Sequence, residues 1–483
     1  MTEYQPVIGL EVHVELATAT KLFCGCPNRF GSEPNTNVCP VCLGLPGSLP
    51  VLNEQVVEYA LRIGEALHFS VPPRSIFHRK NYFYPDMPKD FQTSQYDEPI
   101  CADGWLDTPE GRVEIERAHM EEDTGKTTHV GGGGRITDAE YSLVDYNRAG
   151  VPLMEIVSRP DMHSAEHARA YVAELRAVLQ AIGVSDVKME EGSMRVDANV
   201  SVRPVGQDEF GTRTEIKNMN SLRSLQRAVE YEIERQIGRV EAGERVVLET
   251  RHWNEDDGRT HSMRSKEEAF DYRYFPEPDL VPVEPDDAWK GRVHDAMPEL
   301  PAVRRARLVT DWGISEADAA TLVERPELTT YAEQAVGALR AGTPKDVVNW
   351  SLGDVQGHLN ETGGSPADLA FDPDALAELV GLVGDGTLSR AMAKDVFAAS
   401  IAEGKRPAVV VEERGLAQVS DADELGVLVD SVLAENANDV ASYRDADDGR
   451  RKKIRGALMG KVRAANRDVN MALVGSLLDD RLD

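Results

Sequence analysis

The chain has 483 residues, 41% of them hydrophobic, and a mean hydropathy of −0.38, which together describe a globular protein with too many residues for one core. Its formal net charge of −30, from 83 acidic and 53 basic residues, repels nucleic acid unless positive charge is gathered in one region. The N-terminal segment lacks a secretory pattern, and no apolar stretch approaches the ~18 residues of a membrane span, so we expect a cytoplasmic protein without membrane contact.

The segment 7–16, VIGLEVHVEL, alternates strictly between apolar and polar residues, which predicts a strand with one buried face. The polar face carries Glu11, His13 and Glu15. Such a row is either a solvated surface or part of a metal site, and one strand alone does not decide between them.

Four of the five cysteines form two short pairs, Cys24 with Cys26 and Cys39 with Cys42. The twelve residues between the pairs are rich in turn formers, which can bring the pairs together. Four thiolates close a tetrahedral zinc site, so we predict a structural Zn²⁺. A redox-active Cys-x-x-Cys is the alternative, but it leaves the other pair unexplained. Cys101 stands alone and is expected to pack in the interior.

Other segments predict helices covering the apolar face of a sheet. Residues 194–203, MRVDANVSVR, alternate again, with Arg195 on the polar face. Amphipathic helices are expected over 164–182, capped by Ser164 and stopped by Gly183, and over 221–238. The class predicted for this region is α+β, with a mainly antiparallel sheet whose polar face is left free.

Four prolines within residues 276–285 mark the first domain boundary, because neither a regular helix nor a central strand tolerates them. Strand patterning nearly disappears after this point. Short helices follow, with caps predicted at Ser315, at Asp372 before a proline, and at Ser420. We therefore expect a helical domain and a small helical tail, and we see no internal repeat. The predicted domains are 1–290, 291–405 and 406–483.

Several predicted strands carry carboxylates next to apolar residues. The segment 119–129, HMEEDTGKTTH, contains Glu121 and Glu122, and its likeness to a phosphate-binding loop fails because Met120 stands where that motif needs glycine. Glu155 lies within the apolar run PLMEIV and needs a partner or a cation.

Arginines accompany these carboxylates at Arg148, Arg159 and Arg195. Mg²⁺ prefers oxygen ligands and Arg binds phosphate bidentately, so the pattern favours a magnesium-dependent phosphoryl-transfer site on the free face of the sheet. A set of structural ion pairs is the alternative.

Residues 79–100 interleave cations with aromatic rings, among them Lys80 and Tyr82. Cations for phosphates beside rings for base stacking suit a nucleotide or a single-stranded RNA end. A corner of the aromatic core is the alternative.

The segments quoted above, together with RKNYFYPDMPKDFQTSQYDEPI, EIKNMNSLRSLQRAVEYE and DYRYFPEPDLVP, resemble in the same order the B subunits of the aspartyl-tRNA(Asn)/glutamyl-tRNA(Gln) amidotransferases. The resemblance runs from about residue 7 to the C-terminus. It implies a ligase with a cradle-shaped N-terminal domain that phosphorylates the side-chain carboxylate of misacylated Glu-tRNA(Gln) or Asp-tRNA(Asn), using ATP and Mg²⁺. Ammonia then displaces the phosphate to give Gln-tRNA(Gln) or Asn-tRNA(Asn).

The resemblance also implies residue roles. Magnesium ligands are expected at Glu11, His13, Glu122 and Glu155. Glu121 lies close by and joins them as a catalytic residue, while Glu15 is left as an ordinary polar residue. ATP and substrate contacts are expected from Lys80, Tyr82, Arg148, Arg159 and Arg195. The four clustered cysteines resemble those of zinc-bearing members, in which the metal is structural.

The resemblance implies two partner proteins, an amidase (glutaminase) that releases ammonia from glutamine and is the A subunit of such complexes, and the small C subunit. No amidase signature is found in this chain. The run 450–467 holds eight Lys or Arg and no acid, and it occupies the place expected for tRNA contact, although such a run can also be a solvated face. The tRNA-binding residues expected there are Arg451, Lys452, Lys453, Lys461 and Arg463.

Two other functions remain open. One is a non-catalytic, zinc-containing RNA-binding scaffold whose acidic clusters are structural pairs. The other is a metal-dependent hydrolase using Glu11, His13 and Glu155.

Overall fold

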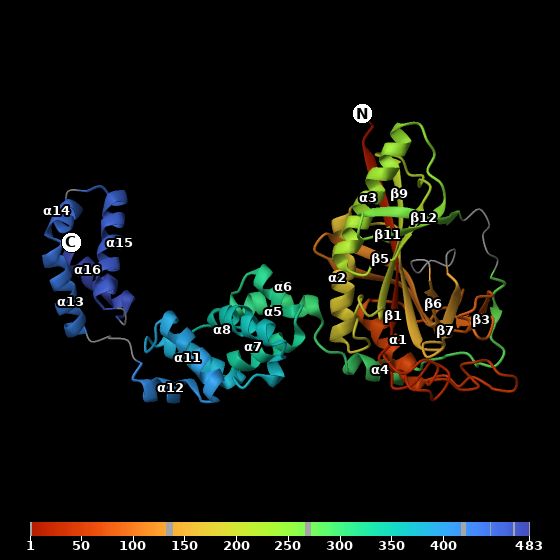
Figure 1. Cartoon of the computed structure of the whole chain (residues 1–483), viewed down its shortest axis with the longest axis horizontal. Helices are drawn as coiled ribbons and strands as arrows, with labels where there is room; N and C mark the ends of the chain where they lie inside the picture. Colours follow the sequence, from red (N-terminus) through yellow and green to blue (C-terminus); the bar gives the residue numbers. More distant parts are fainter. Residues whose placement is uncertain are drawn as a thin grey trace. The chain divides into compact units, whose positions relative to one another are not determined.

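The structure, a computed structural model, describes residues 2–131, 139–265, 272–416, 422–444, 446–466 and 469–482. It divides into two compact units, Met1–Pro301 and Ala302–Asp483. All the strands described lie in the first unit, and the second is helical (Figure 1). The predicted α+β region followed by helices is therefore confirmed.

The first unit is built on an eight-stranded sheet in the order β12-β11-β10-β9-β1-β8-β5-β4. Its neighbouring strands are antiparallel except for β10 and β11, which run parallel. The bounds are β1 Tyr4–Glu15, β4 Cys101–Thr108, β5 Gly111–Glu122, β8 Pro152–Ser158, β9 Met194–Pro204, β10 Thr214–Lys217, β11 Glu249–Asn254 and β12 Arg259–Ser265.

One face of this sheet packs against helices. Leu10, Val12 and Val14 of β1 are fully buried in a single core that also holds the apolar sides of α2 and α3, which lie on the same side of β1 in Figure 1. The helices are α1 Glu54–Ala66, α2 Ala165–Ala181, α3 Leu222–Glu241 and α4 Asp287–Asp295. The Ser164 side chain caps α2 as predicted, and Gly183, with φ of +70°, follows its end.

Two smaller sheets complete the first unit. One has the order β13-β2-β3, and the other is the β6-β7 pair. In Figure 1, β3, β6 and β7 lie on the side of β1 opposite to α2. Their bounds are β2 His78–Asn81, β3 Phe91–Ser94, β6 Lys126–Val130, β7 Tyr141–Asp145 and β13 Phe275–Pro276. The polar face of β1 points away from the helices and can therefore line a binding site.

The second unit contains two separate apolar clusters, one within residues 308–410 and one within residues 425–482. The predicted caps Ser315 and Asp372 are confirmed, whereas Ser420 lies outside the described residues. In the described part of the chain, no helix has the length and apolarity needed to cross a bilayer. The elements are α5 Pro301–Trp312, α6 Glu316–Val323, α7 Pro326–Ala338, α8 Pro344–Trp350, η3 Ser351–Val355, α9 Gln356–Thr362, η4 Pro366–Asp368, α10 Pro373–Gly384, α11 Arg390–Glu403, α12 Pro407–Arg414, α13 Ala422–Glu435, α14 Ala437–Arg444, α15 Asp448–Ala465 and α16 Met471–Leu482.

Candidate active site

Strand register places polar residues from four strands in one row across the sheet. His13 of β1 pairs with Glu155 of β8 on one side and with Arg195 of β9 on the other. Glu155 in turn pairs with His119 of β5. Because paired residues share a face and neighbouring strands are about 4.8 Å apart, their side chains meet above the sheet.

Two carboxylates and two imidazoles form the centre of this row. The Nε2 atom of His13 lies 3.7 Å from Oε1 of Glu121 and 3.6 Å from Oε2 of Glu155. The Nε2 atom of His119 lies 3.2 Å from Oε2 of Glu155 and 3.9 Å from Oε2 of Glu121. Single donor atoms of His13, Glu121 and Glu155 all lie within 4.8 Å of one another, close enough to share a cation.

The charge balance keeps Glu155 ionised. Burial opposes its charged form, but the imidazoles of His119 and His13 and the ammonium of Lys80 outweigh burial and hold the pKa of Glu155 below its ordinary value. Burial also disfavours the charged form of Lys80, but the negative charge of Glu121 and of other neighbours outweighs burial and raises the pKa of Lys80. A negatively charged carboxylate is therefore present where a cation would bind.

A second acidic group adjoins the first on the same face. Single carboxylate oxygens of Glu11, Asp197 and Glu215 lie within 4.8 Å of one another. Lys217 pairs with Asp197 and lies 3.2 Å from Oε1 of Glu215, and Asn199 donates to Oε1 of Glu11 at 2.9 Å. Burial first, and then the charges of Glu155 and Asp197, raise the pKa of Glu11. The carboxylates outnumber the cations here, which favours binding of a divalent ion.

A hollow of about 570 Å³ opens over this face, lined by His13, Lys80, Glu121 and Arg195 among others. Arg195 donates to Oδ2 of Asp123 at 2.9 Å. These four predicted site residues come from β1, β2, β5 and β9, so the fold has gathered distant parts of the sequence at one cavity.

Two further predicted residues flank the hollow without lining it. Arg148 lies 3.3 Å from Oδ2 of Asp123 and donates to the carbonyls of Thr124 and Gly125. Burial, followed by the charge of Glu121, raises the pKa of Tyr82, so its hydroxyl stays protonated. Both residues therefore border the site.

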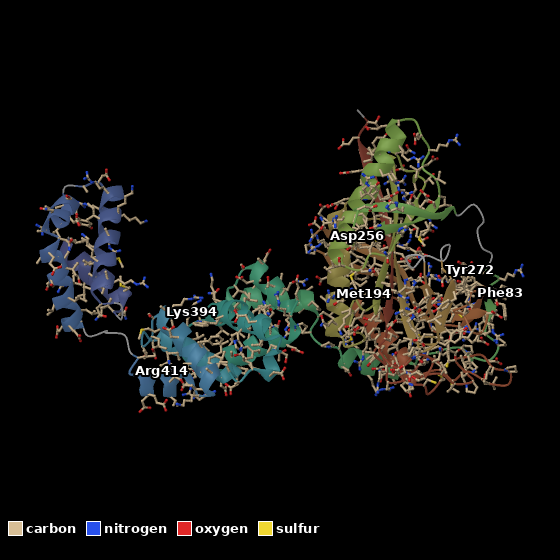
Figure 2. All side chains as sticks on the ribbon, viewed as in Figure 1. Phe83, Met194, Asp256, Tyr272, Lys394 and Arg414 are labelled. Atoms are coloured by element: carbon tan, nitrogen blue, oxygen red, sulfur yellow. The ribbon has the colours of Figure 1, made fainter. Side chains whose placement is uncertain are left out.

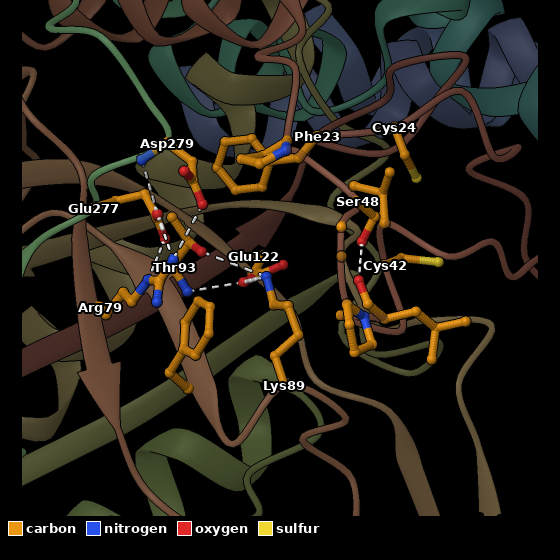
Figure 3. Close-up of a pocket in the computed structure, with 18 residues that line it drawn as sticks. Phe23, Cys24, Cys42, Ser48, Arg79, Lys89, Thr93, Glu122, Glu277 and Asp279 are labelled. Carbon is orange, nitrogen blue, oxygen red and sulfur yellow. Dashed lines mark hydrogen bonds and ion pairs between the residues drawn. The ribbon is translucent and has the colours of Figure 1, made fainter.

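Glu122, which the resemblance gives as a magnesium ligand, lies outside this cluster. Its carboxylate pairs with Lys89 and accepts the backbone N–H of Thr93 at 2.8 Å. It lines a separate hollow of about 250 Å³ beside Cys24 and Cys42 (Figure 3). Successive residues of a strand point to opposite faces, so Glu121 reaches His13 and its neighbour Glu122 does not.

Arg159 also lies apart from the cluster. It follows the end of β8, where its guanidinium lies 2.8 Å from Asp103 and 3.4 Å from Glu114. These residues line a third hollow that includes none of the residues of the His13 cluster. Arg159 follows the alternation that puts Glu155 on the polar face of β8, but it lies beyond the end of that strand and so outside the His13 cluster.

Sequence reasoning assigned no role to several residues that the structure brings to the site: His119, Asp123, Asp197, Glu215 and Lys217. Period-two alternation could have found two of them. His119 stands two positions before Glu121, and Asp197 two positions after Arg195, so each shares a face with a predicted residue. Glu15 is also more than an ordinary polar residue, because burial and the nearby Asp123 raise its pKa to about 7.

The four clustered cysteines come together as predicted. Their sulfur atoms lie within 4.8 Å of one another, and none forms a disulfide. A hydrogen bond from Cys24, the backbone N–H of Cys39 and the charge of Lys21 lower the pKa of Cys42 to about 5. Lys21 is fully buried, and its ammonium donates to the carbonyl of Asn37 at 2.8 Å.

These contacts fit zinc. Four thiolates around one Zn²⁺ carry net negative charge, which would compensate the buried ammonium of Lys21. The donor set therefore suits a closed structural site without an open position for chemistry.

Residues 450–465 of the basic run lie in α15, where their side chains have two kinds of environment. Arg451 donates to the carbonyl of Tyr443 at 3.2 Å, and Lys461 lies 2.7 Å from Asp439, so both hold α15 to its neighbours. The side chains of Lys452, Lys453 and Arg463 are exposed. These three are available to bind phosphates.

Known protein families match segments in both units of the chain. The family described as the GatB/GatE catalytic domain matches residues 6–291, and the GatB domain matches residues 330–482. Two relatives, from Moorella thermoacetica and Thermobifida fusca, are each 52% identical to the chain. The match with the Moorella thermoacetica protein covers 99% of this chain and 100% of that protein, and the match with the Thermobifida fusca protein covers 95% of this chain and 90% of that protein. Both relatives are named as the B subunit of an aspartyl/glutamyl-tRNA(Asn/Gln) amidotransferase.

Proposed function

The chain belongs to the GatB family, the B subunits of tRNA-dependent amidotransferases, which are ligases of translation. We propose that the hollow over His13 activates the side-chain carboxylate of glutamyl-tRNA(Gln) or aspartyl-tRNA(Asn) with ATP, for amidation to Gln-tRNA(Gln) or Asn-tRNA(Asn). One observation carries the proposal: His13, Glu121 and Glu155 converge beside the cations Lys80 and Arg195.

The chemistry requires two steps. An ionised carboxylate is a poor electrophile toward ammonia, so its oxygen first attacks the γ-phosphorus of ATP and ADP leaves. Ammonia then attacks the acyl carbon, phosphate leaves with the C–O bond pair, and the extra proton passes to a base. Lys80 and Arg195 line the hollow and supply positive charge for the phosphoryl oxygens.

Magnesium fits the donor atoms of this site. Glu121 and Glu155 offer carboxylate oxygens, His13 lies between them, and Glu11 belongs to the adjoining acidic group. When bound, Mg²⁺ would neutralise phosphate charge during transfer. The protein's own contribution is to keep the Glu155 carboxylate ionised and to hold the cations opposite it.

The remaining parts of the proposal concern structure and partners. The four cysteines hold a structural Zn²⁺, and the exposed cations Lys452, Lys453 and Arg463 bind tRNA. An amidase partner supplies the ammonia, a small third protein completes a heterotrimer, and the complex works in the cytoplasm.

The test is amidation by the purified complex with Glu-tRNA(Gln), ATP, Mg²⁺ and ammonium chloride. We expect His13→Ala to reduce both ATP consumption and Gln-tRNA(Gln) formation by about 100-fold or more with the fold intact. A wild-type complex without magnesium-dependent ATP turnover would favour the RNA-binding scaffold. Release of free glutamate without an amine acceptor would favour the hydrolase.

A further inference from the structure

Four tyrosines from three separate segments form a continuous series of ring contacts. The ring centroids of Tyr82 and Tyr272 are 6.2 Å apart, and those of Tyr272 and Tyr274 are 6.1 Å apart, both edge to face. Tyr274 and Tyr96 stack in parallel at 4.4 Å with an interplanar angle of 10°. We call Tyr82, Tyr272, Tyr274 and Tyr96 the tyrosine ladder.

The tyrosine ladder begins at the candidate active site. The Lys80 ammonium, which borders the hollow, lies 5.1 Å from the ring centroid of Tyr272. The charge of Lys80 also acts on Tyr274, as do the charges of Glu121 and Glu155. The inner part of the ladder therefore adjoins Lys80, a residue that lines the hollow.

The other end of the ladder faces solvent. Tyr96 is 57% exposed, although its ring is stacked on Tyr274. At the opposite end of the ladder, Phe83, which follows Tyr82 in the chain, is 82% exposed, and in the view of Figure 2 it lies at the same edge of the first unit as Tyr272. Exposed rings that lead away from a polar site are available to a ligand that extends out of it.

Local contacts fix the rings in place. The side chain of Asn81 donates to the carbonyl of Arg273 at 2.8 Å, and its backbone N–H donates to the carbonyl of Tyr272 at 2.9 Å. Arg273 has φ of +45°, an uncommon conformation for a residue with a side chain. The edge of the largely buried His78 meets the rings of Tyr96 and Tyr274 at 6.1 and 6.5 Å. A preformed platform of this kind loses little entropy when a ligand stacks on it.

We propose that the tyrosine ladder binds the unpaired 3′-terminal nucleotides of the aminoacylated tRNA, with bases stacking from Tyr96 inward. The inference rests on the proposed function, which requires an amino acid esterified to an RNA 3′ end to reach Glu121 and Glu155. The RNA that carries this amino acid must leave the hollow along some surface. The ladder provides such a surface, since Tyr272 lies against Lys80, which lines the hollow, and the ring of Tyr96 is exposed.

The chemistry around Tyr96 favours an unpaired strand. The adjacent residues Asp97 and Glu98 are acidic, with side-chain exposures of 67% and 37%, so RNA phosphates find little attraction there and stacking on the rings must supply the affinity. Stacking on aromatic rings needs accessible base faces, which only unpaired nucleotides offer. The adenine of ATP is a single base, whereas the ladder extends over several rings.

A binding cycle with the full-length chain tests the ladder without ATP or Mg²⁺. The dissociation constant is measured at fixed salt for tRNA(Gln) and for the same tRNA lacking its unpaired 3′ nucleotides. We expect Tyr96→Ala to weaken binding of the complete tRNA by about 5- to 100-fold and to leave binding of the shortened tRNA unchanged. Tyr96→Phe, which keeps the ring, should restore the affinity. Phe210→Ala removes an equally exposed ring outside the ladder and should change neither constant.

The inference is overturned if Tyr96→Ala weakens both RNAs equally or weakens neither. It is also overturned if, in the amidating complex, the variant raises the KM for ATP and leaves the KM for aminoacyl-tRNA unchanged. Failure of the proposed function would give a different result. A wild-type complex that does not amidate can still lose affinity for the complete tRNA, but not for the shortened one, when Tyr96 is replaced by Ala. A variant that amidates normally and shows no such selective loss removes the ladder and leaves the proposed function standing.

Discussion

The adjacent residues Glu121 and Glu122 should respond in opposite ways to the same substitution. Glu121→Gln removes a charge from the cluster with His13, so we expect loss of magnesium-dependent ATP turnover with little change in stability. Glu122→Gln removes the partner of Lys89, outside the His13 cluster. We therefore expect it to lower stability and to leave ATP turnover in place.

The magnitude for Glu122→Gln follows from burial. The side chains of Glu122 and Lys89 are 4% and 12% exposed, so the substitution leaves an ammonium in a poorly solvated place. Removing one partner of a buried pair costs about 3 to 5 kcal/mol. The lower value applies because the Lys89 ammonium also lies 5.0 Å from the ring centroid of Phe91. A loss of about 3 kcal/mol lowers the Tm of a unit this large by roughly 6 °C.

Thermal unfolding and ATP turnover are measured on both variants in the same preparation. Glu121→Asp serves as a control, since it keeps the charge and shortens the side chain by one methylene. If Glu122→Gln abolishes ATP turnover at unchanged Tm, or if Glu121→Gln turns over ATP normally, then membership of the His13 cluster is the wrong basis for the roles of the two carboxylates.

Three further predictions concern other parts of the chain. A zinc chelator should lower the Tm of the first unit, and added Mg²⁺ should not restore it; an unchanged Tm would argue against a structural metal at the cysteines. Lys452→Ala with Lys453→Ala should weaken tRNA binding and reduce the salt slope by about 2 without changing the Tm, because both side chains are exposed; a slope equal to that of the wild type would exclude phosphate contacts. Burial opposes ionisation of Glu333, but hydrogen bonds from Arg304 and Arg307 prevail and lower its pKa, so these pairs stabilise the fold above pH 4.5 and lose their contribution below it. Glu333→Gln should therefore cost about 1 kcal/mol at pH 7 and progressively less as the pH falls below 4.5, as thermal unfolding over this pH range will show.

Local patterns were sufficient to predict two strands, with the face on which their side chains lie, and two helices. The alternation in 7–16 placed His13 and Glu11 on the polar face, and Ser164 and Asp372 cap their helices as predicted. The two cysteine pairs were close enough in sequence for their meeting to be foreseen. Each of these features depends on residues that are close in sequence, so the local geometry of a strand, a helix cap or a short loop is enough to bring them together.

The composition of the site could not be obtained in this way. To choose between Glu121 and Glu122, one must know which face of β5 continues the polar face of β1. That depends on the pairing of both strands with β8. A shift by one residue exchanges the two faces of a strand. The resemblance assigned a ligand role to Glu122, whereas the structure places the neighbouring Glu121 in the His13 cluster.

The sequence by itself therefore determined two strands of the main sheet, two of its covering helices, the cysteine cluster and the family, because periodicity, capping and motif identity are properties of short stretches. Only the tertiary structure decided which polar residues share a cavity, since Glu11 and Asn199 are 188 positions apart and meet only through the pairing of β1 with β9. The same holds for the tyrosine ladder, whose rings come from three segments. The physical reason is that register is set by burial of one whole face of the sheet against its helices, a condition that no single segment contains.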